Sequence, residues 1–164
     1  MGRWRAPRPK SAPYITSAGF NALQQELDGL WLRRRDVVQA LSAAAAEGDR
    51  SENAEYIYRK KELGGIDRRI RYLQKRLPEL KVIETPAGGD RVFFGATVTL
   101  LRDGEDELQV RIVGADEIDA AKHWISVDSP LASAILGKPV DTDVSLVIDG
   151  AQHTYEILEL SYAE

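Results

Sequence analysis

The chain has 164 residues, a formal net charge of −4 and no cysteine. A disulfide framework and thiol chemistry are therefore excluded, and no apolar run approaches the roughly 20 residues that a transmembrane helix needs. No apolar stretch follows the basic N-terminal residues, which argues against a secretory signal. We expect a cytoplasmic protein that does not contact a membrane.

The charge is distributed unevenly along the chain. Residues 1–80 carry 16 Lys and Arg against 10 Asp and Glu, whereas residues 81–164 carry 6 against 16. This asymmetry predicts two domains with different partners. Residues 1–13 combine four basic residues with three prolines and show no periodicity. We expect them to form a disordered basic leader, which either touches a polyanion or has no role of its own.

A first helical arm is predicted from Tyr14 to Glu47, with Thr16 or Ser17 as its N-cap. Its apolar residues are spaced alternately three and four apart, as in the seam of a coiled coil. They are Phe20, Leu23, Leu27, Leu30, Val37, Leu41 and Ala44, and Arg34 takes the one missing step. Gly48 is expected to end this helix in a left-handed conformation.

A second arm is predicted from Ser51 to Leu80. Its seam consists of Tyr56, Leu63, Ile66, Ile70, Leu73, Leu77 and Leu80, with Arg59 in one step. The short connection at 48–50 forces the two arms to run antiparallel. Val37 should then lie near Leu63, and Leu30 near Ile70. The sequence therefore predicts a coiled-coil hairpin over residues 14–84.

Basic residues gather on the second arm. They are Arg59, Lys60, Lys61, Arg68, Arg69, Arg71, Lys75 and Arg76. A charged run on a helix is usually a solvated face, but like charges three and four residues apart repel one another. We interpret the crowding after Ile66 as a surface for a polyanion such as a phosphate backbone. Gly64 and Gly65 lie within this arm, and the helix is expected to continue through them.

Asp49 and Glu52 lie between the two arms and allow two interpretations. Their spacing is that of a capping box, with Asp49 as the N-cap of the second helix and Glu52 at its N3 position. Alternatively, both carboxylates bind a hard divalent cation such as Mg²⁺, which takes oxygen ligands and keeps several waters. Two carboxylates do not close such a site, so another molecule must supply the remaining ligands.

The second half predicts a separate α+β domain over residues 91–164, after a linker at residues 85–90. Strands are expected at residues 92–100, 108–113, 124–127, 144–148 and 154–160, forming a small antiparallel sheet around one helix. That helix should run from Pro130 to Leu136, capped by Asp128 or Ser129. His123 and His153 are isolated along the chain, and we interpret both as structural.

The tip segment Gly48-Asp49-Arg50-Ser51-Glu52-Asn53-Ala54-Glu55-Tyr56 resembles the Gre transcript cleavage factors of bacterial RNA polymerase. Further similarity lies in Lys60-Lys61, in Ile66 to Leu73 and in Arg91 to Ala96, and these blocks resemble the GreB subtype, whose basic patch is larger. Arg111 to Gly114 and Ile125 to Pro130 are also similar. The resemblance covers about residues 14–162, with the basic leader and Gly64-Gly65 as departures.

This resemblance implies an FKBP-like C-terminal domain that docks at the rim of the polymerase secondary channel through Asp128, Ser129 and Pro130. It implies that the hairpin enters the channel and that Asp49 and Glu52 help to hold a second Mg²⁺, completed by the polymerase. The chain would not itself be an enzyme. It would stimulate cleavage of the 3′ end of the nascent RNA in backtracked complexes. The RNA would be contacted by Arg59, Lys60, Arg68, Arg69 and Arg71.

Three alternatives remain open at this stage. One is a factor of the same fold that occupies the channel and inhibits without cleavage. Another is a coiled-coil adaptor that binds an unrelated protein and uses the acidic tip only as a cap. The third is a freestanding nuclease, which an incomplete metal shell disfavours. A monomer is expected in each case, because the hairpin satisfies its own seam.

Overall fold

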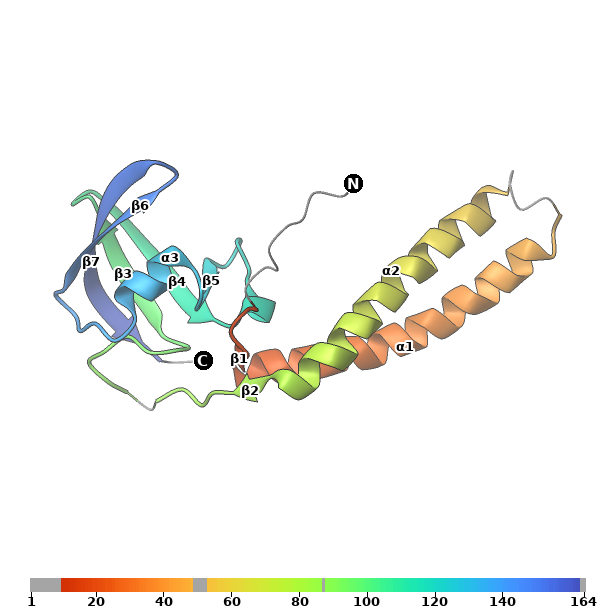
Figure 1. Ribbon diagram of the computed structural model, residues 1–164, viewed down its shortest axis with the longest axis horizontal. Helices are drawn as coiled ribbons and strands as arrows, with labels where there is room; N and C mark the ends of the chain where they lie inside the picture. The colour runs from red at the N-terminus through yellow and green to blue at the C-terminus, as the bar shows by residue number, and fades with distance from the viewer. Residues whose placement is uncertain (1–9, 49–52, 87, 163–164) are drawn as a thin grey trace, which may run out of the picture. The chain divides into compact units, whose positions relative to one another are not determined.

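The computed structural model describes residues 10–48, 53–86 and 88–162 (Figure 1). Two compact units make up the chain. One comprises Ala18–Leu80, and the other joins the residues up to Ser17 with those from Lys81 onward. No helix within the described ranges is long and apolar enough to cross a membrane.

The helical unit is an antiparallel pair. Helix α1 runs over Ser17–Ala45 and α2 over Ala54–Arg76, followed by the short 3₁₀ helix η1 at Leu77–Glu79. A 29-residue α-helix such as α1 is about 43 Å long. The start of the second arm was predicted too early, because its first helical residue is Ala54 and not Ser51. The α-helical geometry also ends before Leu80, at the turn that contains Pro78.

The predicted seam holds the two helices together. Val37, Ile66 and Ile70 form a buried cluster, and Leu27, Leu30 and Leu63 pack against it. The predicted proximity of the first arm to Leu63 and Ile70 is therefore confirmed. Helix α2 also continues through Gly64 and Gly65 without a break, as expected.

Ion pairs between the helices flank this seam and fix the register. Arg33 donates to Glu62 through Nε at 2.9 Å and Nη2 at 2.5 Å. Arg34, at the gap in the apolar pattern, places its Nε 2.7 Å from Asp67 Oδ1. Arg69 donates to both carboxylate oxygens of Glu26, at 2.6 and 2.9 Å. Each pair is partly exposed, so each adds modestly to stability and mainly selects one alignment of the arms.

The second unit is built on a five-stranded sheet with strand order β5-β4-β3-β7-β6. The strands are β3 (Thr97–Arg102), β4 (Asp106–Val113), β5 (Trp124–Ser126), β6 (Asp143–Ile148) and β7 (Ala151–Ser161). The short helix α3, Pro130–Ile135, buries Ala132 and Ile135 in the same core as the strands. The α+β class is confirmed, but the sheet is mixed rather than wholly antiparallel, because β5 pairs parallel with β4.

Two tight turns set the hairpins of this sheet. Asp103 and Gly104 both have positive φ, as do Asp149 and Gly150, which is the backbone of a two-residue turn matched to strand twist. The first strand was predicted to begin at Val92, but β3 begins at Thr97. Gly95 interrupts extension there with a φ of 89°, and its amide donates to Ile112 O at 2.8 Å.

The residues before α1 belong to the sheet unit. Strand β1 (Tyr14–Ile15) pairs parallel with β2 (Lys81–Val82). Glu117, in the 3₁₀ helix η2 (Ala115–Glu117), accepts hydrogen bonds from the amides of Thr16 and Gly114 and from the Thr16 hydroxyl. A Cβ at Gly114 would lie 2.0 Å from the Tyr14 carbonyl oxygen, so only glycine allows this approach.

These contacts place the boundaries of the compact units after Ser17 and after Leu80. The predicted hairpin domain, residues 14–84, included β1 and β2, which instead pair with each other. Most of the predicted leader, residues 1–13, lies outside the described part of the chain. Within it, Ala12 N donates to Asp128 Oδ2 at 2.8 Å and Pro13 O accepts from Lys81 N at 2.7 Å.

We predict that Ile70→Ala destabilises the helical unit by about 2–5 kcal/mol, because it opens a cavity in the seam. Ile70 is 3% exposed. The matched control is Leu32→Ala, at a side chain that is 60% exposed, which should change stability by less than about 0.5 kcal/mol. Urea unfolding followed by the helical circular dichroism signal measures both. Equal effects of the two substitutions would contradict the seam.

Candidate functional site

The acidic pair Asp49 and Glu52 lies outside the described residues, so the site is defined by the helix ends that bracket it. Helix α1 ends at Ala45, and Gly48 has a φ of 126°. Helix α2 begins at Ala54. Both carboxylates therefore belong to the loop that connects the end of α1 to the start of α2. Within the described ranges, no group of three or more His, Asp or Glu could hold a metal ion.

Asn53 caps α2 and joins the two arms. Its side-chain oxygen accepts from Tyr56 N at 3.1 Å, and its Nδ2 donates to Ala44 O at 2.7 Å. One amide side chain thus satisfies a free N–H at the start of α2 and a carbonyl near the end of α1.

The predicted capping box was therefore wrong. The N-cap is Asn53 rather than Asp49, and N3 is Tyr56 rather than Glu52. The physical reason is that an amide can both accept from the α2 backbone and donate to α1, whereas a carboxylate only accepts. Sequence reasoning missed Asn53, although its position directly before a helix-favouring Ala-Glu pair is a usable signal. The capping box therefore does not account for the two acids of the loop.

An ion-pair network follows the cap on the side of α2 nearer α1. Arg59 donates to Glu55 at 2.8 Å and to Glu62 at 3.1 Å, and Glu62 also accepts from Arg33. The hydrogen bond that Arg59 donates to Glu55, and then that to Glu62, raise the pKa of Arg59. The hydrogen bond from Arg33, and then that from Arg59, lower the pKa of Glu62.

The five basic residues predicted to contact RNA separate into two groups. Arg59 and Arg69 are engaged by carboxylates of the helical unit, Glu55 and Glu62 for the former and Glu26 for the latter. Lys60, Arg68 and Arg71 are exposed and form no ion pair with any described residue. That any of the five contacts RNA stays a prediction. The positive charges of the second group are not paired with a described carboxylate of the hairpin.

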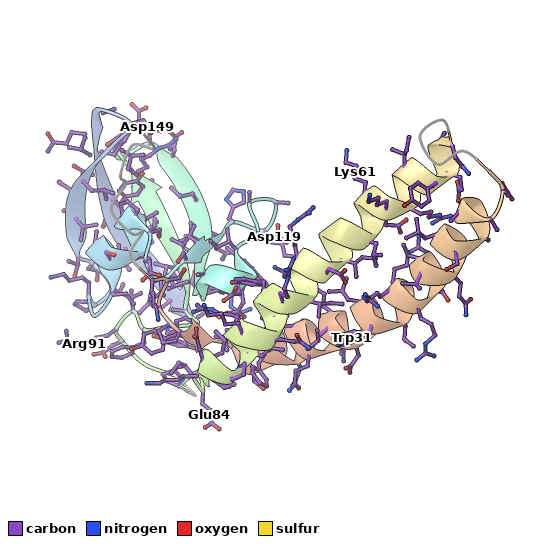
Figure 2. The ribbon with its side chains drawn as sticks, turned by 45° about the vertical axis from the view of Figure 1, so that its right-hand side comes forward. Trp31, Lys61, Glu84, Arg91, Asp119 and Asp149 are labelled. Atoms are coloured by element: carbon purple, nitrogen blue, oxygen red, sulfur yellow. The ribbon has the colours of Figure 1, made fainter. Side chains whose placement is uncertain are left out.

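These exposed cations belong to a set of basic residues on one side of the helix, which we name the outer face of α2. Its members are Lys60, Lys61, Arg68, Arg71 and Lys75. Figure 2 shows Lys61 extending from the side of α2 that is turned away from α1. Tyr58 and Tyr72 border this face, with 61% and 43% of their surface exposed. Exposed cations interleaved with aromatic rings are typical of surfaces that bind single-stranded nucleic acid.

The predicted docking residues lie where β5 leads into α3. Ser129 is the N-cap of α3, its Oγ accepting from Ala132 N at 3.3 Å, and Pro130 opens the helix, as expected. The Asp128 amide donates to Ser126 Oγ at 3.0 Å, and its carboxylate accepts from Ala12. Local hydrogen bonds thus fix this segment, and Pro130 is exposed at its end.

A second group of acidic residues lies on the sheet unit, around the turn between β3 and β4. A cavity of about 450 Å³ is lined by Leu101, Asp103, Gly104, Asp143, Thr154 and Glu156. His153 Nδ1 lies 2.7 Å from Asp103 Oδ2, and this hydrogen bond lowers the pKa of Asp103. Asp103 Oδ1 accepts from Thr154 N at 2.9 Å, so the carboxylate ties the β3–β4 turn to β7.

Comparison with known proteins decides the family. Residues 13–82 match the model of a transcription elongation factor N-terminal domain, and residues 86–162 match that of the GreA/GreB C-terminal domain. The chain belongs to the GreA/GreB family of transcription elongation factors. The boundary between the two matched regions lies close to the return of the chain into the sheet unit at Lys81.

Curated relatives within this family are GreB factors. Transcription elongation factor GreB of Xanthomonas axonopodis pv. citri (strain 306) is 55% identical, over 99% of both chains. GreB of Yersinia pestis is 52% identical and covers 91% of this chain and 88% of its own. GreB of Pseudomonas aeruginosa is 49% identical, over 99% of this chain and 98% of its own. The resemblance to the GreB subtype is thus confirmed over nearly the whole length.

We predict that two substitutions of Asn53 separate its two hydrogen bonds. Asn53→Ala removes both and should destabilise the helical unit by about 1–2 kcal/mol. Asn53→Asp keeps the acceptor for Tyr56 N and loses only the donor to Ala44 O. Amide hydrogen exchange should therefore quicken at the end of α1 in both variants, and at the start of α2 only with Ala. Identical exchange in both variants would contradict the bridging role.

We also predict an acid-sensitive contribution from Glu62. Its pKa is lowered from the usual value of 4.5, so its stabilisation is present above that value and is lost as the pH falls through the lower pKa of the folded state. Thermal unfolding between about pH 5 and pH 3 should show a steeper loss for the wild type than for Glu62→Gln. Equal slopes in the two proteins would contradict this contribution.

Proposed function

We propose that the chain enters the secondary channel of RNA polymerase and stimulates the polymerase's own cleavage of the RNA 3′ end in backtracked complexes. The observation that carries this proposal is the acidic pair in the loop between the far ends of two long helices, in a member of an elongation-factor family. Because Asn53 already caps α2, the two carboxylates are not needed for helix termination.

In this proposal Asp49 and Glu52 act as partial ligands of a shared Mg²⁺. Their donor chemistry fits, because Mg²⁺ prefers oxygen ligands and accepts one or two carboxylates besides waters and phosphate. When bound, the ion would stabilise the charge that develops on the phosphodiester and activate a water. The chain's contribution is to carry two anionic oxygens on a loop whose ends are joined by Asn53. The polymerase would supply the remaining ligands, so the chain is not itself the enzyme.

The outer face of α2 would bind the RNA that backtracking extrudes. Its support is the set of cations without an ion pair among the described residues, bordered by exposed tyrosines. Phosphate contacts release counterions, so this contribution should weaken as salt rises. Arg59 and Arg69 are engaged with carboxylates, on α2 itself and on α1 respectively, and would contribute less to holding RNA.

The sheet unit would dock at the rim of the channel through Asp128, Ser129 and Pro130. Support for this part comes from the fixed geometry of that segment and its position at the exposed start of α3. β5 leads into it, and the centroid of the Trp124 ring there lies 5.0 Å from Arg111 Cζ and 4.7 Å from Lys122 Nζ. We infer a monomer, because the helical unit buries its seam within one chain.

The test is RNA cleavage in stalled, backtracked polymerase complexes. Asp49→Asn/Glu52→Gln should reduce the stimulated rate by at least about 10- to 100-fold, because the loss of direct ligands exceeds the effect of changing their neighbours. Glu47→Gln, an exposed acid of the same tip, is the matched control and should retain activity. Circular dichroism should show the same helical content in all variants.

The outcomes separate the proposal from its alternatives. Equal stimulation by the wild type and the double variant would show that the two charges serve no metal. Binding to the polymerase without stimulation by the wild type would instead favour a channel-occupying inhibitor. A failure of the wild type to co-purify with the polymerase would favour the adaptor.

A further inference from the structure

The last residues of the predicted leader lie against the segment that would dock on the polymerase. Ala12 N donates to Asp128 Oδ2 at 2.8 Å, although the two residues are 116 positions apart in the chain. Pro13 O accepts from Lys81 N at 2.7 Å, next to the pairing of β1 with β2. Hydrogen bonds thus hold Ala12 and Pro13 in place beside the docking segment.

The hydrogen bond from Ala12 engages one oxygen of Asp128 and leaves the other available. Among the described residues, Asp128 Oδ1 accepts no hydrogen bond and the carboxylate has no ion pair. A backbone amide carries no net charge, so Asp128 keeps its negative charge while the rotation of its side chain is restricted. Fixing a side chain before binding reduces the entropy that is lost when a complex forms. The Ala12 amide therefore prepares Asp128 for a partner and does not replace one.

Lys10 places a positive charge near this carboxylate. Its side chain is exposed and forms no ion pair with a described residue. Two residues of extended chain span at most about 7 Å, so the backbone of Lys10 lies close to the amide that binds Asp128. The surface therefore presents two opposite charges, and neither is matched by an ion pair within the described ranges.

We propose that residues 10–13 form part of the surface that docks on RNA polymerase. In this arrangement the Ala12 amide orients Asp128, whose second oxygen binds a cation or an N–H donor of the polymerase. Lys10 meets an acidic group of the polymerase beside it. The inference rests on the proposed function, in which the segment at the start of α3 docks at the rim of the channel. Charges across an interface complement one another, which selects the partner and steers its approach.

The neighbouring carboxylate favours a protein partner over a nucleic acid. A phosphate that approached Lys10 would also meet the negative charge of Asp128, and like charges placed side by side oppose binding. A protein surface can present an acid and a base at the spacing that the two charges require. Pro130 is exposed close to Asp128 and adds apolar surface, which protein interfaces bury at their centre.

A proline substitution tests the amide. Ala12→Pro removes the N–H that Asp128 accepts, and residue 12 already precedes a proline, which favours an extended backbone that proline also adopts. Biolayer interferometry with immobilised RNA polymerase should show about two- to tenfold weaker binding, mainly through faster dissociation. Ser11→Pro is the matched control and should bind as the wild type does, because the Ser11 amide bonds to no described residue. Thermal unfolding of both variants checks that the fold is retained.

A double variant tests whether the amide acts through Asp128. If it does, Ala12→Pro/Asp128→Ala should bind about as weakly as Asp128→Ala alone, because the two losses share a cause. Additive losses would overturn the orienting role of the amide, and so would wild-type affinity in Ala12→Pro.

Substitution of Lys10 tests the second charge. Lys10→Glu should slow association with the polymerase by about two- to fivefold, and Lys10→Gln by less. Both effects should shrink as salt is raised, because exposed charges are screened. Equal association rates in the three proteins would overturn the assignment to an acidic group. Normal polymerase binding by Lys10→Glu, together with weaker binding of a single-stranded RNA oligonucleotide, would show that Lys10 serves a nucleic acid instead.

The same variants separate this inference from the proposed function. If Asp128→Ala weakens binding to the polymerase while Ala12→Pro and Lys10→Glu do not, residues 10–13 take no part in docking and the proposed docking segment stands. If all three weaken binding but the wild type stimulates no RNA cleavage, the extended docking surface stands and the proposed function is wrong.

Discussion

The apolar seam between α1 and α2 is the interaction on which the rest of the helical unit depends. Val37, Ile66 and Ile70 are buried there although each helix is otherwise largely solvated. Most of the stability of a helix in a protein comes from packing of its apolar face, so burial along the seam is what stabilises this helical pair. The ion pairs beside the seam cannot replace it, because partly exposed pairs contribute little. Their role is to prevent the arms from sliding, which would displace the loop that carries Asp49 and Glu52.

Charge is used differently on the two sides of α2. Arg69 pairs with Glu26 of α1 and so helps to select the register, whereas Arg59 pairs with Glu55 and Glu62 of its own helix. The outer face of α2 carries cations that have no such match among the described residues, and the helix tolerates their mutual repulsion. A run of basic residues in a sequence therefore contains two populations, which differ in whether a carboxylate of either helix lies within reach.

Periodic features were predictable from the sequence, and features that depend on a neighbour were not. The spacing of Leu30, Val37 and Ile70 was enough to predict the arms and their facing residues, because a seam repeats every three or four residues. The capping box failed because Asn53 is selected by a carbonyl of the other helix, which local spacing does not encode. The closure of β1 on β2 was missed for the same reason, since it joins segments distant in the chain, and the parallel pairing of β5 with β4 depends on the path of the chain between Val113 and Trp124.

The pairing of β1 with β2 makes the helical hairpin an insertion whose two ends are held side by side. Tyr14 pairs with Lys81 and Ile15 with Val82, so the chain leaves the sheet unit and returns to it at the same place. Joining these strands in an unfolded chain means closing a long loop, which is entropically unfavourable. A hairpin that folds first, through its many local contacts, shortens that loop and brings the strands together. Formation of the helical unit thereby becomes a step in the assembly of the sheet unit. Lengthening both helices by the same number of heptads should therefore leave the pairing of β1 with β2 intact.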